Sequence, residues 1–312
     1  MTAEIGILNK NGVVLASDSA VTLSDGKNSK VFNSARKLFT LSKEHSVGIM
    51  IYGNASFMEV PWEVILNEFK QTIGKGVLDN TAQYVDELIR FLINFKHTQV
   101  EDLLINYIVR SARSILDNIA YQSQETADLR ASNGETITLD SFNKILLDNI
   151  NNFSLEISKI EIEHHFEFFE AELNLLKSIV EDFFKTFPHT DGEVDVIAKS
   201  LYKAIFTGYD SSNVTGLVIA GYGKEEIFPS IRQVELYGIF SQRLIWKVIN
   251  ESEINHNKTC HIIPFAQSEM VETIMNGIDP NLNIFIAEQL SSVLDKNGLG
   301  EETEKIFENI SS

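Results

Sequence analysis

The beginning of the chain places the tightest limit on its fold. Residues 4–10 alternate apolar and polar side chains, as a half-buried β-strand does, and Asn11-Gly12 follows directly. Asn and Gly accept the positive φ angles of a two-residue hairpin turn, so the chain should return as a second strand over residues 13–17. The sequence therefore predicts a tight antiparallel hairpin close to the first methionine.

Elements of one kind are grouped along the rest of the chain. Two further strands are expected at residues 37–42 and 46–52, and helical spacing of apolar residues begins near Pro61. Four strands and two amphipathic helices come last, at residues 214–221, 231–237, 244–249 and 259–263 for the strands and at 267–275 and 282–294 for the helices. Segregated runs favour an α+β layered fold over alternating parallel βαβ units. We expect a single domain over residues 1–312, with a helical segment at 61–206.

The helical segment has one long uninterrupted stretch. After a polar break at residues 131–138, residues 141–187 contain neither proline nor glycine, which predicts one very long helix or two. Glu161 and His165 are spaced i and i+4 in this stretch and could share a metal ion on a helix. The apolar residues around them favour an ordinary amphipathic helix with a charged outer face, so we expect no metal and no cofactor.

Composition narrows the class of partner and the compartment. The 26 basic and 44 acidic side chains give a net charge of −18, which would repel nucleic acid and anionic membrane surfaces. No apolar run reaches the roughly 18 residues of a membrane helix, and no basic region precedes an apolar stretch at the N-terminus. Cys260 is the only cysteine, so no internal disulfide can form. A cytoplasmic protein is expected.

Thr2 is the first residue that suggests chemistry. Initiator methionine is normally removed when a small residue follows, which would leave threonine at the amino terminus. One residue would then carry a hydroxyl nucleophile and an α-amine with a pKa near about 7.7 to 8.0, which can accept the hydroxyl proton. A Met-Thr start alone more often means a frayed terminus.

Two charged residues lie at the ends of strands that follow Thr2 in the sequence. The hairpin brings Asp18, at the end of its second strand, back toward residues 4 and 5, and Lys37 begins the next strand. Taken singly, a strand-end aspartate is usually a turn or cap residue, and a lysine at a strand end is usually solvated. The combination of all three residues in this order carries the functional interpretation.

These features, in this order, resemble the proteasome β-subunit family of N-terminal-nucleophile hydrolases. Residues 5–22 (IGILNKNGVVLASDSAVT) look like the opening hairpin of that family without a gap, and Lys37-Leu38-Phe39 occupies the place of its lysine-bearing strand. The resemblance covers about residues 2–57 and 205–294. It implies a four-layer αββα sandwich with a long helical insertion.

The resemblance also implies roles for individual residues. Thr2 would be the nucleophile, with its own α-amine as base. Lys37 would place an ammonium beside the Thr2 hydroxyl, and Asp18 would hold that lysine charged and in position. The backbone N–H of Met50 would stabilise the oxyanion, and Thr22 would bind an extended substrate backbone.

The chain departs from the family pattern at two places. The family usually has glycine where Met50 is aligned, so a side chain there could reshape the oxyanion site. Where the family carries a serine in a glycine-rich turn, this chain has Ala266, with Ser268 two residues further on as a supporting hydroxyl.

The expected function is that of a threonine peptidase that cleaves amide bonds in peptides or proteins without a cofactor. Two alternatives stay open, a non-catalytic structural or regulatory subunit and a small-molecule amidase on the same fold. A homo-oligomer, such as a ring, is expected because the helical segment is rich in phenylalanine that another subunit or the cleft could cover. Packing within the inserted helices would account equally well for these residues, which are Phe166, Phe168, Phe169, Phe183, Phe184 and Phe187.

Overall fold

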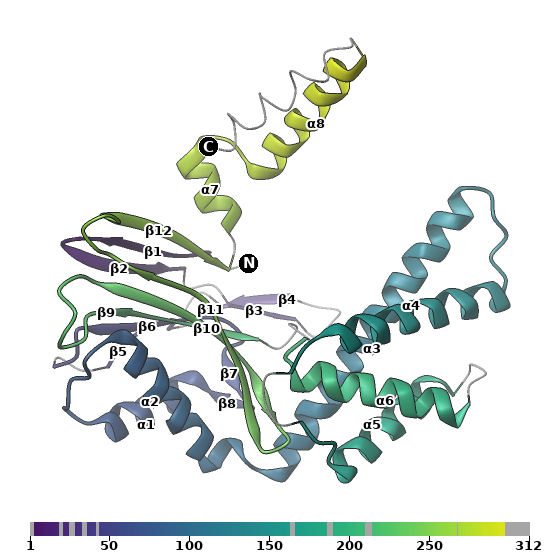
Figure 1. Ribbon diagram of the computed structural model, residues 1–312, viewed down its shortest axis with the longest axis horizontal. Helices are drawn as coiled ribbons and strands as arrows, with labels where there is room; N and C mark the ends of the chain where they lie inside the picture. Colours follow the sequence, from purple (N-terminus) through teal and green to yellow (C-terminus); the bar gives the residue numbers. More distant parts are fainter. Residues whose placement is uncertain are drawn as a thin grey trace.

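The computed structural model of the chain describes residues 3–18, 21–24, 29–32, 36–41, 44–162, 166–185, 190–209, 214–266 and 268–296. The chain is an α+β protein with antiparallel sheets, as its segregated strands and helices predict. Figure 1 shows two stacked sheets with helices against the larger one and a group of longer helices beside them.

The N-terminal hairpin forms and belongs to a three-stranded sheet. Its strands are β1 (Ala3–Asn9) and β2 (Gly12–Ser17), and β12 (Cys260–Ala266) pairs with the other edge of β1. The turn lies one residue earlier than the sequence suggested, because Asn9 pairs with Gly12. The Asn9 side-chain oxygen accepts the N–H groups of Asn11 and Gly12, at 2.8 and 3.1 Å, and so holds the turn without positive φ angles.

The larger sheet has five antiparallel strands in the order β11-β10-β9-β6-β5. Their bounds are Leu38–Thr40 for β5, Val47–Gly53 for β6, Thr215–Gly221 for β9, Ser230–Phe240 for β10 and Arg243–Glu253 for β11. The central strand β9 is buried along its whole length, which explains its run of small and aliphatic residues.

Two short hairpins were not anticipated from the sequence. One consists of β3 (Val21–Ser24) and β4 (Ser29–Phe32), and the other of β7 (Ser56–Phe57) and β8 (Val60–Pro61). The described residues up to Gly53 therefore contain six strands instead of the four expected. Strands of two to four residues are too short to show an alternating pattern.

Each face of the five-stranded sheet is covered. Helices α1 (Trp62–Ile73) and α2 (Thr81–Asn94) pack on one face, where Phe69, Leu88 and Ile219 belong to one buried apolar cluster. The three-stranded sheet lies against the opposite face (Figure 1). The core between the two sheets contains Leu8, Met50, Val218, Ile231 and Phe265. Alternation along the strands thus produces two separate apolar layers.

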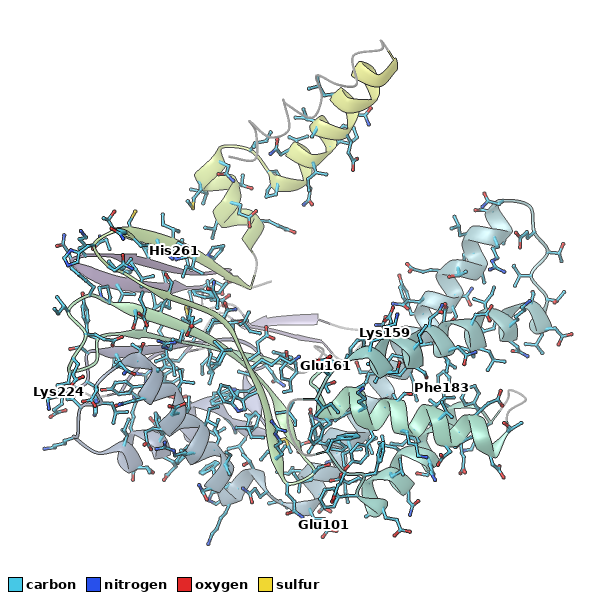
Figure 2. The ribbon with its side chains drawn as sticks, viewed as in Figure 1. Glu101, Lys159, Glu161, Phe183, Lys224 and His261 are labelled. Carbon is cyan, nitrogen blue, oxygen red and sulfur yellow. The ribbon has the colours of Figure 1, made fainter. Side chains whose placement is uncertain are left out.

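The helical segment continues with a short 3₁₀ turn and four helices. Their bounds are Lys96–Thr98 for η1, Glu101–Ser132 for α3, Leu139–Lys159 for α4, Glu170–Phe183 for α5 and Asp191–Phe206 for α6. The stretch at 141–187 therefore contains two helices. Glu161 lies beyond the end of α4 (Figure 2), and His165, the other residue of the suggested metal pair, is outside the described residues.

Helices α3 to α6 share a core with the β10–β11 hairpin. Tyr202 of α6 stacks edge-on against Phe240, at 4.7 Å between ring centroids, and Phe166 contacts both Tyr202 and Phe206. Of the phenylalanines noted in the sequence, Phe184 is buried, whereas Phe168 and Phe169 are 43% and 44% exposed. Phe187 lies outside the described residues.

The chain continues after β12 with α7 (Ser268–Asn276) and α8 (Pro280–Lys296). Helix α7 contacts β1 and β12, whereas α8 leads away from the sheets (Figure 1). Among the helices of the described part of the chain, none combines the length and the apolar character that crossing a membrane requires.

Gly223 is expected to be a sensitive backbone position. A Cβ atom at Gly223 would lie 2.2 Å from the Asp79 carbonyl oxygen, because the β9–β10 connection is docked against the start of α2. Gly223→Ala should therefore lower the free energy of unfolding by about 2 kcal/mol or more. Gly76→Ala is the control, since nothing lies within 4 Å of a Cβ there. Urea unfolding that shows equal stability for the two variants would contradict this packing.

Candidate active site

Lys37 forms the centre of a buried charged cluster. It directly precedes β5 and is 8% exposed. Its Nζ lies 2.5 Å from Asp18 Oδ1 and 3.1 Å from Glu4 Oε1. One ammonium thus contacts two carboxyl groups, an arrangement that compensates its loss of hydration.

Three strands position this cluster. Glu4 lies on β1 and faces inward with Gly6 and Leu8, which are also buried. Asp18 follows the last residue of β2, and Ser17 pairs with Glu4, so Asp18 is opposite position 3. The Lys37 carbonyl accepts the N–H of Ile51 in β6 at 2.9 Å, which fixes the lysine backbone beside the larger sheet.

The two carboxyl groups have different environments. Asp18 is 36% exposed, whereas Glu4 is completely buried. Burial is the main reason why the pKa of Glu4 is raised, and the hydrogen bond and charge of Lys37 oppose that rise. The second oxygen of Glu4, Oε2, has no hydrogen-bond partner among the described residues. Such a buried, incompletely satisfied acid destabilises the fold, which favours a functional explanation for its presence.

The cluster can stabilise negative charge that develops near the start of β1. A fixed ammonium in a partly desolvated site lowers the energy of an alkoxide or oxyanion much more than one in water. Asp18 and Glu4 hold Lys37 in position before any reaction begins, so no reorganisation is needed at that moment.

Three other site residues suggested by the sequence are Thr2, Thr22 and Ser268, and their side chains are outside the described part of the structure. Thr2 is outside the described residues, and Ala3, the next residue, pairs with Ala266 at the end of β12. Thr22 is in β3 opposite Val31, and Ser268 is the first residue of α7; their side chains are not described.

Met50 lies in β6 between β5 and β9. It is aligned with Leu38 on one side and with Val218 on the other, and its side chain is completely buried between the sheets. Because the Ile51 N–H points to Lys37, the Met50 N–H points toward β9. To stabilise an oxyanion, the Met50 N–H would have to give up its place in the hydrogen-bond ladder between β6 and β9.

Glu4 is the member of the cluster that sequence reasoning missed. The signal was the strand period itself, because Glu4, Gly6 and Leu8 occupy the core-facing positions of β1. An acid on the apolar face of a strand predicts a buried partner, which here is Lys37.

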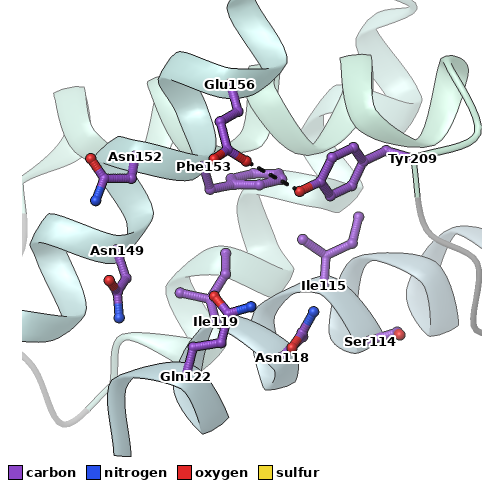
Figure 3. Close-up of a pocket in the computed structure, with 10 residues that line it drawn as sticks. All are labelled: Ser114, Ile115, Asn118, Ile119, Gln122, Asn149, Asn152, Phe153, Glu156 and Tyr209. Atoms are coloured by element: carbon purple, nitrogen blue, oxygen red, sulfur yellow. Dashed lines mark hydrogen bonds between the residues drawn. The ribbon is translucent and has the colours of Figure 1, made fainter. Parts of the chain in front are cut away.

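Two of the grooves formed by the described residues differ in their relation to the charged cluster. One of about 520 Å³ runs between the edge strands β2 and β5 and includes Arg36 and Leu38, the sequence neighbours of Lys37. The other, of about 320 Å³, lies between α3 and α4 and is lined by carboxamides such as Asn118 and Asn149 (Figure 3). Because the first groove includes residues on either side of Lys37 in the sequence, it is the better candidate for a substrate channel.

The described part of the chain contains no group of three or more His, Cys, Asp or Glu side chains arranged to hold a metal ion. The comparison with protein-family models gives no match for this chain, and the comparison with curated proteins gives none either.

Proposed function

We propose that this protein is a hydrolase that cleaves amide bonds by acyl transfer to Thr2 after Met1 has been removed. The observation that carries the proposal is the contact of buried Lys37 with both Asp18 and Glu4. Glu4 is the second residue of β1, and β1 begins at Ala3, the residue that follows Thr2 in the sequence. In the sequence Thr2 comes two residues before Glu4, whose side chain contacts Lys37. Peptides or proteins are the proposed substrates, and no cofactor takes part.

The proposed reaction has two steps. The Thr2 hydroxyl oxygen attacks the substrate carbonyl, its proton passes to the α-amine, and the C–N bond breaks as that proton reaches the leaving amine. Water then attacks the resulting ester and releases the acid and free Thr2. Lys37 stabilises the oxygen anion that develops at Thr2, while Asp18 and Glu4 position Lys37.

The proposed architecture is the four-layer αββα sandwich of N-terminal-nucleophile hydrolases. The stacking of α1 and α2, the five-stranded sheet and the three-stranded sheet supports three of its layers, and α7, which contacts β1 and β12, is the candidate for the fourth. Helices α3 to α6 would then be an insertion into a single domain. We propose the cytoplasm as its compartment.

Two alternative functions retain specific support. The Met50 side chain occupies the core between the sheets, at a position where the proteasome β-subunit family, which the sequence resembles, usually has glycine. Ala266 stands where that family has a serine. Both observations favour a non-catalytic structural or regulatory subunit. A small-molecule amidase would use the same residues and differ only in the acyl group.

A peptide epoxyketone tests the proposal, because its two electrophilic carbons require a hydroxyl and a free α-amine on one residue. Intact-mass analysis of the native protein should show loss of Met1, and peptide mapping should place the adduct on Thr2. Retention of Met1, or no adduct on protein that has lost it, would favour the non-catalytic subunit. Substrate profiling with peptides and small amides distinguishes the two enzymatic candidates.

A further inference from the structure

The outer face of the three-stranded sheet carries a row of apolar side chains that stay exposed in the described part of the chain. Ile7 of β1 is aligned with Val14 of β2 and Ile262 of β12, so these three side chains lie side by side across the sheet. They are 40%, 61% and 36% exposed. Large aliphatic side chains in such a row normally pack against another element.

Helix α8 also has an apolar face that is exposed among the described residues. Leu282, Phe285, Ile286 and Leu290 follow the i, i+3, i+4, i+8 spacing of one helix face. Their exposed fractions lie between 43% and 57%, and α8 leads away from the sheets (Figure 1). Within the described part of the chain, two apolar faces are therefore without a partner, one on a sheet and one on a helix, which are the two kinds of surface that pack together in layered folds.

The turn between α7 and α8 is well formed in this orientation. Gly277 has a φ of 73° and donates its N–H to the Thr273 carbonyl at 2.9 Å, which closes α7. Asp279 Oδ1 accepts the N–H groups of Asn281 and Leu282, at 2.9 and 3.1 Å, which caps α8. Folding α8 back onto its own sheet would require this capped turn to change, whereas a second molecule can receive α8 as it stands.

We infer that two copies of this chain exchange their α8 helices, so that α8 of each copy packs on the outer face of the three-stranded sheet of the other. A two-fold axis would satisfy both apolar faces in both copies. Each contact would join three side chains of the sheet face to four side chains of α8, each of them about half exposed. The two contacts together would bury on the order of 1,000 Å², near the lower limit of a specific interface. The net charge of −18 on each copy opposes association, so the dimer should tighten as salt screens that repulsion.

Cysteine cross-linking tests the exchange directly, because Cys260 is the only cysteine and is exposed at the start of β12. Asn283→Cys and Gln289→Cys, made separately, each add one exposed thiol to α8. A short bis-maleimide should then give a covalent species of twice the 35.1 kDa chain mass, with Cys260 joined to the α8 cysteine of another molecule. A cross-link within one molecule would overturn the exchange and place α8 on its own sheet.

Sedimentation velocity provides a second readout on chains without added cysteines. Phe285→Ser should weaken dimerisation by about 100-fold or more, because each dimer contains two such contacts. Val196→Ser on α6 is the matched control, since Val196 is 55% exposed and outside both faces. A strict monomer at micromolar concentration in high salt, or equal dimerisation by both variants, would overturn the proposal.

Discussion

Thr2→Ala is expected to abolish amide hydrolysis, with a loss in kcat of at least about 10³-fold. Removal of the nucleophile from a catalytic unit costs this much or more, because the residues around it cannot form the acyl intermediate. The measurement is turnover of a peptide substrate found by profiling, together with labelling by the epoxyketone. Both should be lost together, since both need the Thr2 hydroxyl.

Two variants make this result interpretable. Thr2→Ser keeps a hydroxyl and an α-amine and should retain measurable turnover. Thr136→Ala removes an exposed hydroxyl from the connection between α3 and α4, far along the chain from the cluster and its groove, and should leave turnover unchanged. Full activity of Thr2→Ala would show that the hydrolysis comes from another group or from a contaminant.

Lys37→Met is expected to destabilise the protein by about 3–5 kcal/mol at neutral pH, in addition to removing activity. The substitution leaves Glu4 buried and close to Asp18 without the cation that compensates both. Burial already raises the pKa of Glu4, and the charge of Asp18 raises it further, so loss of Lys37 removes the main opposing influence. Guanidinium unfolding of the variant and of the native chain gives the difference.

The pH dependence of this difference has a definite sign. A carboxyl whose pKa is raised by folding stabilises the protein below its unfolded pKa, and that stabilisation is lost as pH rises through the folded pKa. The destabilisation by Lys37→Met should therefore be largest at neutral pH and should shrink as pH falls toward about 4.3, the ordinary value for glutamic acid. Glu4→Gln in the Lys37→Met background should recover part of the lost stability at neutral pH.

Arg36→Met is the control for a change of charge alone. Arg36 is exposed and lies 3.8 Å from the exposed Glu63, so its removal should change stability by less than about 1 kcal/mol. Equal losses for Arg36→Met and Lys37→Met would mean that the buried cluster has no special energetic role.

Long periodic elements were the most predictable part of this fold. The spacing of apolar residues located α2, α6 and the central strands β6 and β9, because burial on one side imposes a period of 3.6 or 2. The hairpin turn was misplaced by one residue because an Asn9 side chain can cap a turn that sequence patterns assign to Asn11-Gly12. The break between α4 and α5 could not be located, since Ile160 and Ile162 continue an apolar pattern outside the helix.

The candidate site was predictable where backbone pairing alone decides proximity. The hairpin places Asp18 near the start of β1, and the structure brings Lys37 to the same place. The inward direction of Glu4 also follows from the strand period, but its ion pair with Lys37 depends on how the two sheets stack. Pairing between elements far apart in sequence is set by tertiary packing, which local patterns do not encode.

The shared core of the helical segment and the β10–β11 hairpin has a thermodynamic consequence. Tyr107 of α3 occupies the space that a side chain at Gly238 would need, and Tyr237 and Phe240 are buried against helices α3 to α6. The helices therefore cannot unfold while the hairpin keeps its native packing, and heat should melt sheet and helices in one transition. Removal of the helices would expose the aromatic rings of Tyr237 and Phe240 to water, so this sheet needs the helical segment for its stability.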